Sequence, residues 1–145
     1  MQKRIIQTQK MLLTTDTELF DKVIETDHPF KQLDRLVDFT ELVKPLRGFY
    51  STLGRTGVDI EKGFKCLIVQ YWEDLSDREM ELAVKYNLVV RWFCGFGLPA
   101  ETPDHTYFCK LRKRLGTKRI ADVFRQLNKI LEGYGMFGNV FSFID

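Results

Sequence analysis

Two successive helices are encoded by residues 59–84, DIEKGFKCLIVQYWEDLSDREMELAV. Asp59 can cap the first helix, in which apolar residues recur at helical spacing: Ile60, Phe64, Leu67, Ile68 and Tyr71. After a break at 73–75, Ser76 and Glu79 have the spacing of a capping box. The helix that they start has an apolar inner face, formed by Met80, Ala83 and Val84. Short helices joined by tight breaks are typical of a helix-turn-helix arrangement.

Upstream of this pair the pattern predicts a polar arm over residues 1–14 and a short helix from Thr15 to about Thr26. His28-Pro29 ends that helix, because a residue before proline avoids the helical region. Amphipathic turns follow between 33 and 43 and stop near Pro45. The three glycines between 48 and 57 indicate a loop.

Downstream, the apolar run 88–96 predicts a third short helix, with Arg91 as its only charge. Asp104 can cap a helix that runs to Leu115 and stops at Gly116. Thr117 is the expected cap of the last helix, whose core stripe is Ile120, Val123, Phe124, Leu127, Ile130 and Leu131. Residues 139–145 have the composition of a strand. The predicted fold is therefore all-α, with a helix-turn-helix-like arrangement, ending in one short β-strand.

Composition limits the classes of protein to which the chain can belong. Its 145 residues suit one compact domain, and 44% hydrophobic and 13% aromatic residues can form a core. No run approaches the roughly 18 apolar residues of a membrane span, and the start is a poor secretion signal. We therefore expect a cytoplasmic protein with no membrane partner. Three distant cysteines and two histidines do not have metal-ligand spacing, so buried free thiols and no cofactor in this chain are expected.

Positive charge is concentrated late in the chain. Residues 102–145 contain eight basic and four acidic residues, whereas the residues before them have a net charge of −2. In the helix after Asp104, an apolar side formed by Phe108, Leu111 and Leu115 lies opposite basic residues, which is the layout of a DNA-recognition helix and equally of an ordinary solvated helix. Arg112 falls near the core edge, where it reaches a phosphate or covers apolar surface. The candidate DNA-binding residues are His105, Thr106, Tyr107, Lys110, Arg112, Lys113, Arg114, Lys118 and Arg119.

Other residues have two interpretations. The aromatic residues of two apolar runs form either a base-stacking platform or part of the core: Tyr71, Trp72, Trp92 and Phe93. Arg91 contacts DNA or lies at the edge of the core, and His105 donates to a phosphate or is a plain first-turn residue. The arm with Lys3, Arg4 and Lys10 enters a minor groove or is a disordered tail.

Read as a string, residues 28–145 resemble the N-terminal region of bacterial DDE-type insertion-sequence transposases of the InsH-type group. The matching landmarks occur in order: HPFKQLDRLVDF (28–39), ELVKPL (41–46), Gly54-Arg55, the helix pair 59–84, NLVVRWFCGFGL (87–98) and TPDHTYFCKLRKRLG (102–116). Each landmark is weak alone, but their joint order and spacing is specific. Thr56 stands where the family usually has proline, and Tyr107 where it often has a small hydroxyl residue.

The residue pattern assigns an arm and short helix to 1–27. The resemblance implies a helical DNA-binding domain over 28–135 and, over 136–145, the first strand of a truncated RNase H-like catalytic domain. In such enzymes three carboxylates hold two divalent metals, with Mg²⁺ expected for the complete enzyme. FSFID (141–145) is similar to the strand that ends in the first carboxylate, so Asp145 is the candidate catalytic residue and metal ligand; its alternative is a solvated aspartate. With the other carboxylates missing, we expect no transposition chemistry from this chain alone.

The leading functional hypothesis is a DNA-binding part of a transposase that recognises terminal inverted repeats of its element. The expected partner is double-stranded DNA, with homodimerisation or pairing with a full-length transposase as a second interaction. The alternatives are a truncated regulatory or inhibitory DNA-binding protein, an inert fragment, and a helical protein-interaction domain. The helix after Asp104 is the expected base-contacting helix, with the segment 88–96 as its rival.

Overall fold

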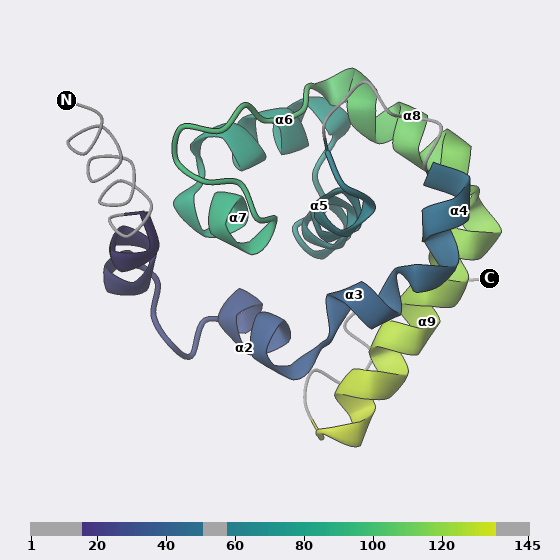
Figure 1. Ribbon diagram of the computed structural model, residues 1–145, viewed down its shortest axis with the longest axis horizontal. Helices are drawn as coiled ribbons and strands as arrows, with labels where there is room; N and C mark the ends of the chain where they lie inside the picture. The colour runs from purple at the N-terminus through teal and green to yellow at the C-terminus, as the bar shows by residue number, and fades with distance from the viewer. Residues whose placement is uncertain (1–15, 51–57, 136–145) are drawn as a thin grey trace, which may run out of the picture.

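The computed structural model describes residues 16–50 and 58–135, and all regular structure within these ranges is helical (Figure 1). A first helical segment spans 16–23. It is followed by α2 (Pro29–Leu36), α3 (Phe39–Leu42), the 3-10 helix η1 (Lys44–Leu46), α4 (Arg47–Tyr50), α5 (Ile60–Trp72), α6 (Asp77–Tyr86), α7 (Leu88–Phe93), α8 (His105–Leu115) and α9 (Thr117–Gly133). The predicted all-α class is confirmed for these residues. The predicted strand 139–145 lies outside them.

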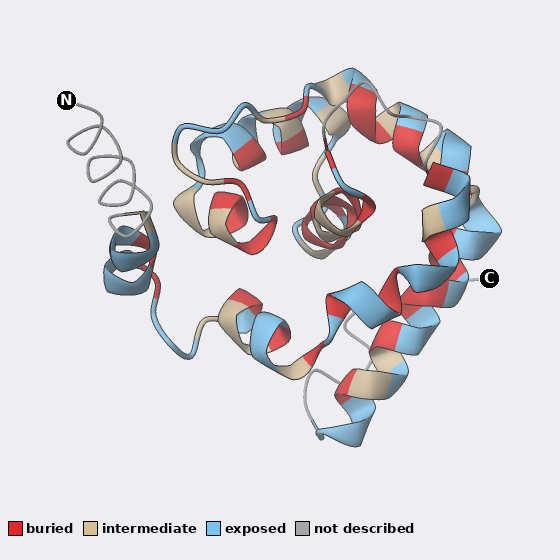
Figure 2. Ribbon diagram, in the orientation of Figure 1, coloured by how far each residue is buried: buried red, intermediate tan, exposed pale blue. Residues whose placement is uncertain are grey.

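The other helices surround α5, which is seen nearly end-on in the middle of Figure 1. Its buried side chains include Phe64, Leu67 and Ile68, as the apolar spacing predicted, and its start is capped by the side chain of Asp59. Tyr71 is an exception to the predicted stripe, because 43% of it is exposed. Figure 2 shows the buried residues of the surrounding helices turned mainly toward this centre. Each fully buried large apolar side chain contributes roughly 1.5–3 kcal/mol.

Helix α6 begins as predicted. Ser76 accepts a hydrogen bond from the Glu79 backbone N–H at 3.1 Å, and the Ser76 N–H donates to the Glu79 carboxylate at 3.0 Å. This capping box lowers the pKa of Glu79 through the Ser76 N–H. At the other end, Asn87 caps α7 by accepting from the N–H groups of Val89 and Val90. One residue therefore separates α6 from α7.

Three local predictions are wrong. The predicted 48–57 loop starts too early, since Gly48 and Tyr50 belong to α4. Pro45 lies inside η1 rather than stopping a helix, because a proline near the first position of a helix loses no internal hydrogen bond. Thr117 is the first residue of α9 and caps nothing: α8 and α9 share Gly116, whose φ of 83° makes the turn between them.

The aromatic residues with two interpretations are mostly part of the core. Phe93 is buried and stacks on Phe30 with ring centroids 4.9 Å apart, while Trp72 and Trp92 are half-buried against the same core. Cys66 and Cys94 are buried free thiols, and burial raises the pKa of Cys94; Cys109 is half-buried. No helix in the described ranges is long and apolar enough to cross a lipid bilayer.

Candidate nucleic-acid interface

Helix α8 has a buried side and a basic side. Asp104 caps its start by accepting hydrogen bonds from the N–H groups of Thr106 and Tyr107, as the sequence predicted. Its buried side chains are Tyr107, Phe108, Leu111 and Leu115. Lys110, Lys113 and Arg114 are exposed and, at spacings of three and four residues, lie on one side of the helix. We call these three residues the basic face.

The basic face is not neutralised within the described part of the chain. No ion pair between residues of 16–50 and 58–135 involves Lys110, Lys113 or Arg114. Charges that make no internal ion pair can pair with phosphates, and they release condensed counterions when they do. The arrangement can therefore supply the electrostatic part of a DNA interface.

Arg112, also predicted to contact DNA, is bound to α6. Its guanidinium donates to both carboxylate oxygens of Asp77, at 2.8 and 2.7 Å, and to the side-chain oxygen of Gln70 at 3.1 Å. The hydrogen bond with Arg112 is the main reason that the pKa of Asp77 is lowered. Arg112 therefore joins α8 to α6 and α5, and it is not available to a phosphate in this conformation.

The start of α8 is bound to α6 as well. His105 donates its backbone N–H to a carboxylate oxygen of Glu81 at 2.7 Å, and its Nδ1 lies 3.0 Å from the same oxygen. The hydrogen bond with His105 lowers the pKa of Glu81. The exposed Thr106 donates its hydroxyl to Asp104 at 2.6 Å. His105 thus lies on the flank that faces α6, whereas Thr106 lies on the exposed side.

Tyr107 does not reach the surface. It is 4% exposed, and its hydroxyl lies 2.7 Å from that of Tyr50, which itself hydrogen-bonds to the carbonyl of Val58. Burial, followed by the bond to Tyr50, raises the pKa of Tyr107. The hydroxyl fits because Gly63 of α5 has no side chain where it lies. The candidate DNA-binding residue Tyr107 is therefore left out of the proposed interface.

Lys118 and Arg119, at the start of α9, extend the positive charge beyond Gly116. Lys118 is exposed and forms no ion pair with another residue of the described ranges. Arg119 donates to the carbonyl of Leu115 at 3.0 Å, and its guanidinium lies 3.7 Å from the ring centroid of Phe49. Of the two, Lys118 has the side chain that is more available to a phosphate.

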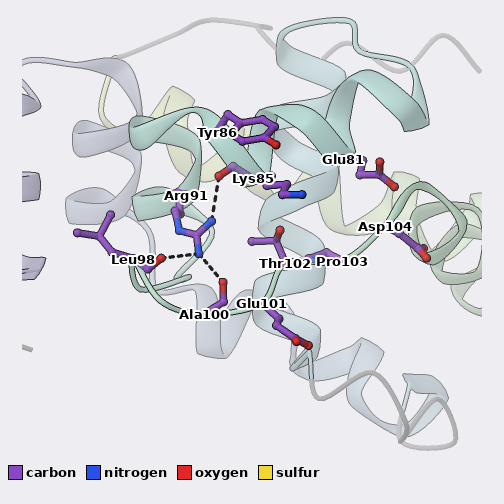
Figure 3. Close-up of a pocket in the computed structure, with 10 residues that line it drawn as sticks. All are labelled: Glu81, Lys85, Tyr86, Arg91, Leu98, Ala100, Glu101, Thr102, Pro103 and Asp104. Carbon is purple, nitrogen blue, oxygen red and sulfur yellow. Dashed lines mark hydrogen bonds between the residues drawn. The ribbon is translucent and has the colours of Figure 1, made fainter. Parts of the chain in front are cut away.

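Arg91, the only charge of the rival helix α7, has a structural role. It is 8% exposed and donates to the carbonyls of Lys85, Gly97, Leu98 and Ala100. Figure 3 shows three of these bonds at the wall of a hollow of about 620 Å³ between the end of α6 and the segment that leads into α8. Its burial and its four carbonyl acceptors favour the interpretation of Arg91 as a residue at the edge of the core.

Sequence reasoning missed the partners of α8. It interpreted Ser76 and Glu79 as a capping box and assigned no partner to Asp77 or Glu81, yet the carboxylates of Asp77 and Glu81 bind Arg112 and His105. The available signal was their spacing of four residues, which places both on one side of α6. No cluster of three potential metal ligands occurs within residues 16–50 and 58–135. The candidate ligand Asp145 lies outside these ranges, so that hypothesis stays a prediction.

A family model described as Transposase domain (DUF772) matches residues 18–114. The chain belongs to this family. The matched region of the transposase domain includes the whole basic face and ends within α8, so Lys118 and Arg119 lie beyond it. No curated protein and no solved structure matches the chain.

Proposed function

We propose that this transposase domain binds duplex DNA at the ends of its insertion element, as part of an InsH-type, DDE transposase. The observation that carries the proposal is the basic face: three exposed cations on one side of an eleven-residue helix whose opposite side is buried. A helix of this kind can lie in the major groove with its apolar side on the protein and its basic side on bases and phosphates. Lys118, on the next helix, adds a contact to the phosphate backbone of the DNA.

The proposed arrangement assigns α8 as the base-contacting helix of a helix-turn-helix-like unit. Helix α7 is a weaker candidate, because Val90, Arg91 and Phe93 are buried and it has no exposed cation. Helix α6 lies against α8 through Asp77 and Glu81, so it is the element that supports α8 on the protein side. Exposed large apolar side chains include two pairs four residues apart on one helix, Leu19 with Val23 in the segment 16–23 and Leu82 with Tyr86 in α6, so protein interaction is the alternative function.

The experiment measures binding of the purified chain to a pool of duplexes with a randomised core, followed by sequencing of the bound fraction. An enriched duplex is then compared with its scrambled version by fluorescence anisotropy at two salt concentrations. We expect an enriched sequence and an affinity that falls steeply with salt. The absence of both in the folded wild type contradicts the proposal and leaves an inert fragment or a protein-interaction domain.

A matched pair of triple variants locates the interface. Lys110→Ala, Lys113→Ala and Arg114→Ala together remove the basic face, and we expect loss of the sequence preference and of most of the salt dependence. The control removes three exposed positive charges elsewhere: Lys22→Ala, Arg35→Ala and Lys129→Ala. Equal losses in the two triple variants indicate a nonspecific charge effect and count against α8.

The catalytic part of the proposal concerns residues outside the described ranges. We propose that Asp145 is the first of the three carboxylates that bind Mg²⁺ in a DDE transposase. Calorimetric titration of the chain with Mg²⁺ tests one consequence: a single carboxylate binds the ion only weakly. Tight binding by this chain contradicts the assignment.

A further inference from the structure

Two carboxylates of α6 contact α8, one at its first residue and one in its last turn. Asp77 and Glu81 are one helical turn apart, which places both on the side of α6 that faces α8. Their partners Arg112 and His105 are seven residues apart, about 10 Å along the axis of α8. We call Asp77 and Glu81 the α6 carboxylate pair.

We propose that the α6 carboxylate pair positions α8 for sequence discrimination, a role that rests on the proposed function and extends it to residues that contact no DNA. Two polar contacts near opposite ends of a helix fix both its tilt and its rotation about its own axis. On its other side α8 is held by the buried hydrogen bond between Tyr107 and Tyr50 of α4, so the pair fixes the side that faces α6. The pair therefore contributes to the direction in which the basic face points.

The apolar core cannot do this alone. Phe108, Leu111 and Leu115 are fully buried, but hydrophobic contact is not directional and tolerates small rotations. The contact between Asp77 and Arg112 is two-pronged, with a third bond from Gln70, and such a planar arrangement has a defined geometry. At the other end, one Glu81 oxygen binds both the backbone N–H and the ring of His105.

Small rotations matter because base contacts are short. A rotation of about 10° moves an atom about 6 Å from the helix axis by about 1 Å. That displacement breaks a bidentate hydrogen bond to a base edge, whereas attraction between an exposed cation and a phosphate changes little. Loss of the pair is therefore expected to reduce specificity and to preserve nonspecific affinity.

The test uses Asp77→Asn with Glu81→Gln and measures dissociation constants for two duplexes. One is the duplex that the wild type enriches from the randomised pool, and the other is its scrambled version. We expect the dissociation constant for the scrambled duplex, divided by that for the enriched duplex, to fall at least tenfold. The affinity for the scrambled duplex and the salt slope should stay unchanged relative to the control. The control is Asp27→Asn with Glu132→Gln, which removes two exposed carboxylates away from α8 and corrects for the change in net charge.

A second variant excludes general destabilisation. Asp77→Glu retains the charge and the ion pair but lengthens the connection by one methylene, so it displaces α8 while preserving the link to α6. We expect a reduced ratio with a melting temperature within a few degrees of the wild type. A purely structural role predicts loss of folded protein and equal weakening on both duplexes.

The outcomes are distinguishable. An unchanged ratio in the folded double variant, or in Asp77→Glu, overturns the positioning role and leaves the proposed function intact. Absence of any enriched sequence with the wild type overturns the proposed function, and the positioning role with it. A reduced ratio at an unchanged salt slope supports both.

Discussion

Arg112 of α8 and Asp77 of α6 form a two-pronged ion pair with N–O distances of 2.8 and 2.7 Å, at side chains that are 30% and 27% exposed. A pair of this geometry, partly removed from solvent, contributes more than an ordinary surface pair, for which the usual value is about 0–1 kcal/mol. It also explains why Arg112, a basic residue in the middle of a basic helix, is turned toward α6 and is not part of the basic face.

The first prediction is that Arg112→Ala lowers the free energy of unfolding by about 1–2 kcal/mol, since Asp77 loses its main partner. Arg114→Ala, on the exposed basic face, changes it by less than about 0.5 kcal/mol. Urea denaturation of both variants gives the comparison. In DNA titrations the order reverses: Arg114→Ala reduces the salt slope by about 1, and Arg112→Ala leaves it unchanged. A reduced salt slope for Arg112→Ala means that the ion pair opens and Arg112 contacts phosphate.

The second prediction concerns acid. The hydrogen bond to Arg112 lowers the pKa of Asp77 in the folded protein, so the unfolded chain takes up the proton first as pH falls. The stabilisation is fully present above the unfolded-state pKa of about 3.9 and is lost as pH falls through the lower folded-state value. We expect Asp77→Asn to be less stable than the wild type by about 1 kcal/mol at pH 7. The difference should shrink below pH of about 4.

Denaturation of both proteins between pH 7 and pH 3 measures this difference directly. Glu73→Gln is a suitable control, because Glu73 is an exposed carboxylate at the end of α5 for which no ion pair is found among the described residues. Its stability difference from the wild type should stay small throughout. If the free energy of unfolding of Asp77→Asn differs from that of the wild type by the same amount at every pH, an ionic contribution from Asp77 is excluded.

Much of the fold was predictable because its signals are local. The caps formed by Asp59, Ser76 and Asp104 depend on residues two or three positions away, and the structure confirms all three. The core stripe of α9 follows from helical spacing alone, and only Ile130 within it is half-buried rather than buried. Thr117 failed as a cap because a glycine with positive φ can start the next helix directly from the end of the previous one.

The candidate site was less predictable because its contacts span the sequence. Helical spacing correctly predicted that Lys110 and Lys113 are on the side of α8 opposite its apolar residues, because that placement depends on the helix alone. The contacts of Tyr107 and Arg112 are instead made with distant residues: Tyr107 with Tyr50, 57 positions away, and Arg112 with Asp77, 35 positions away. Helical periodicity specifies the side of a helix on which a residue lies, but it does not specify which other helix packs there. For that reason the spacing did not predict that two of the candidate DNA-binding residues, Tyr107 and Arg112, make contacts within the protein.

The third prediction uses two glycines. A methyl group at Gly63 would overlap the hydroxyl of Tyr107 and approach Leu111 at 3.2 Å, so α5 and α8 would have to separate. We expect Gly63→Ala to lower the free energy of unfolding by about 1–3 kcal/mol, as overpacking does. Gly48→Ala is the matched control: its new methyl group meets no atom within 4 Å. Because Gly48 lies in α4, alanine there should be neutral or stabilising by up to about 1 kcal/mol. Equal effects of the two changes mean that α5 and α8 are not in close contact at Gly63.

The last prediction concerns Arg91, whose four carbonyl acceptors connect the end of α6 to the segment 97–100 that leads into α8 (Figure 3). Arg91→Ala leaves these carbonyls without their charged donor and opens a gap beneath the segment. We expect a loss of about 3 kcal/mol or more, and Arg91→Lys should recover only part of it, because an ammonium group cannot match the planar fork of donors. Arg78→Ala removes an exposed arginine from α6 and should change stability by less than about 0.5 kcal/mol.

Hydrogen exchange can show where the Arg91 variants lose protection. If Arg91 fixes the path into α8, the amides of residues 97–100 and of the first turn of α8 exchange faster in Arg91→Lys, while those in the middle of α5 stay protected. This pattern separates a local role from a general loss of stability, which accelerates exchange throughout the core. Uniform acceleration would show that Arg91 stabilises the whole domain without a particular effect on the start of α8. Local acceleration would make Arg91 part of the support that orients the basic face.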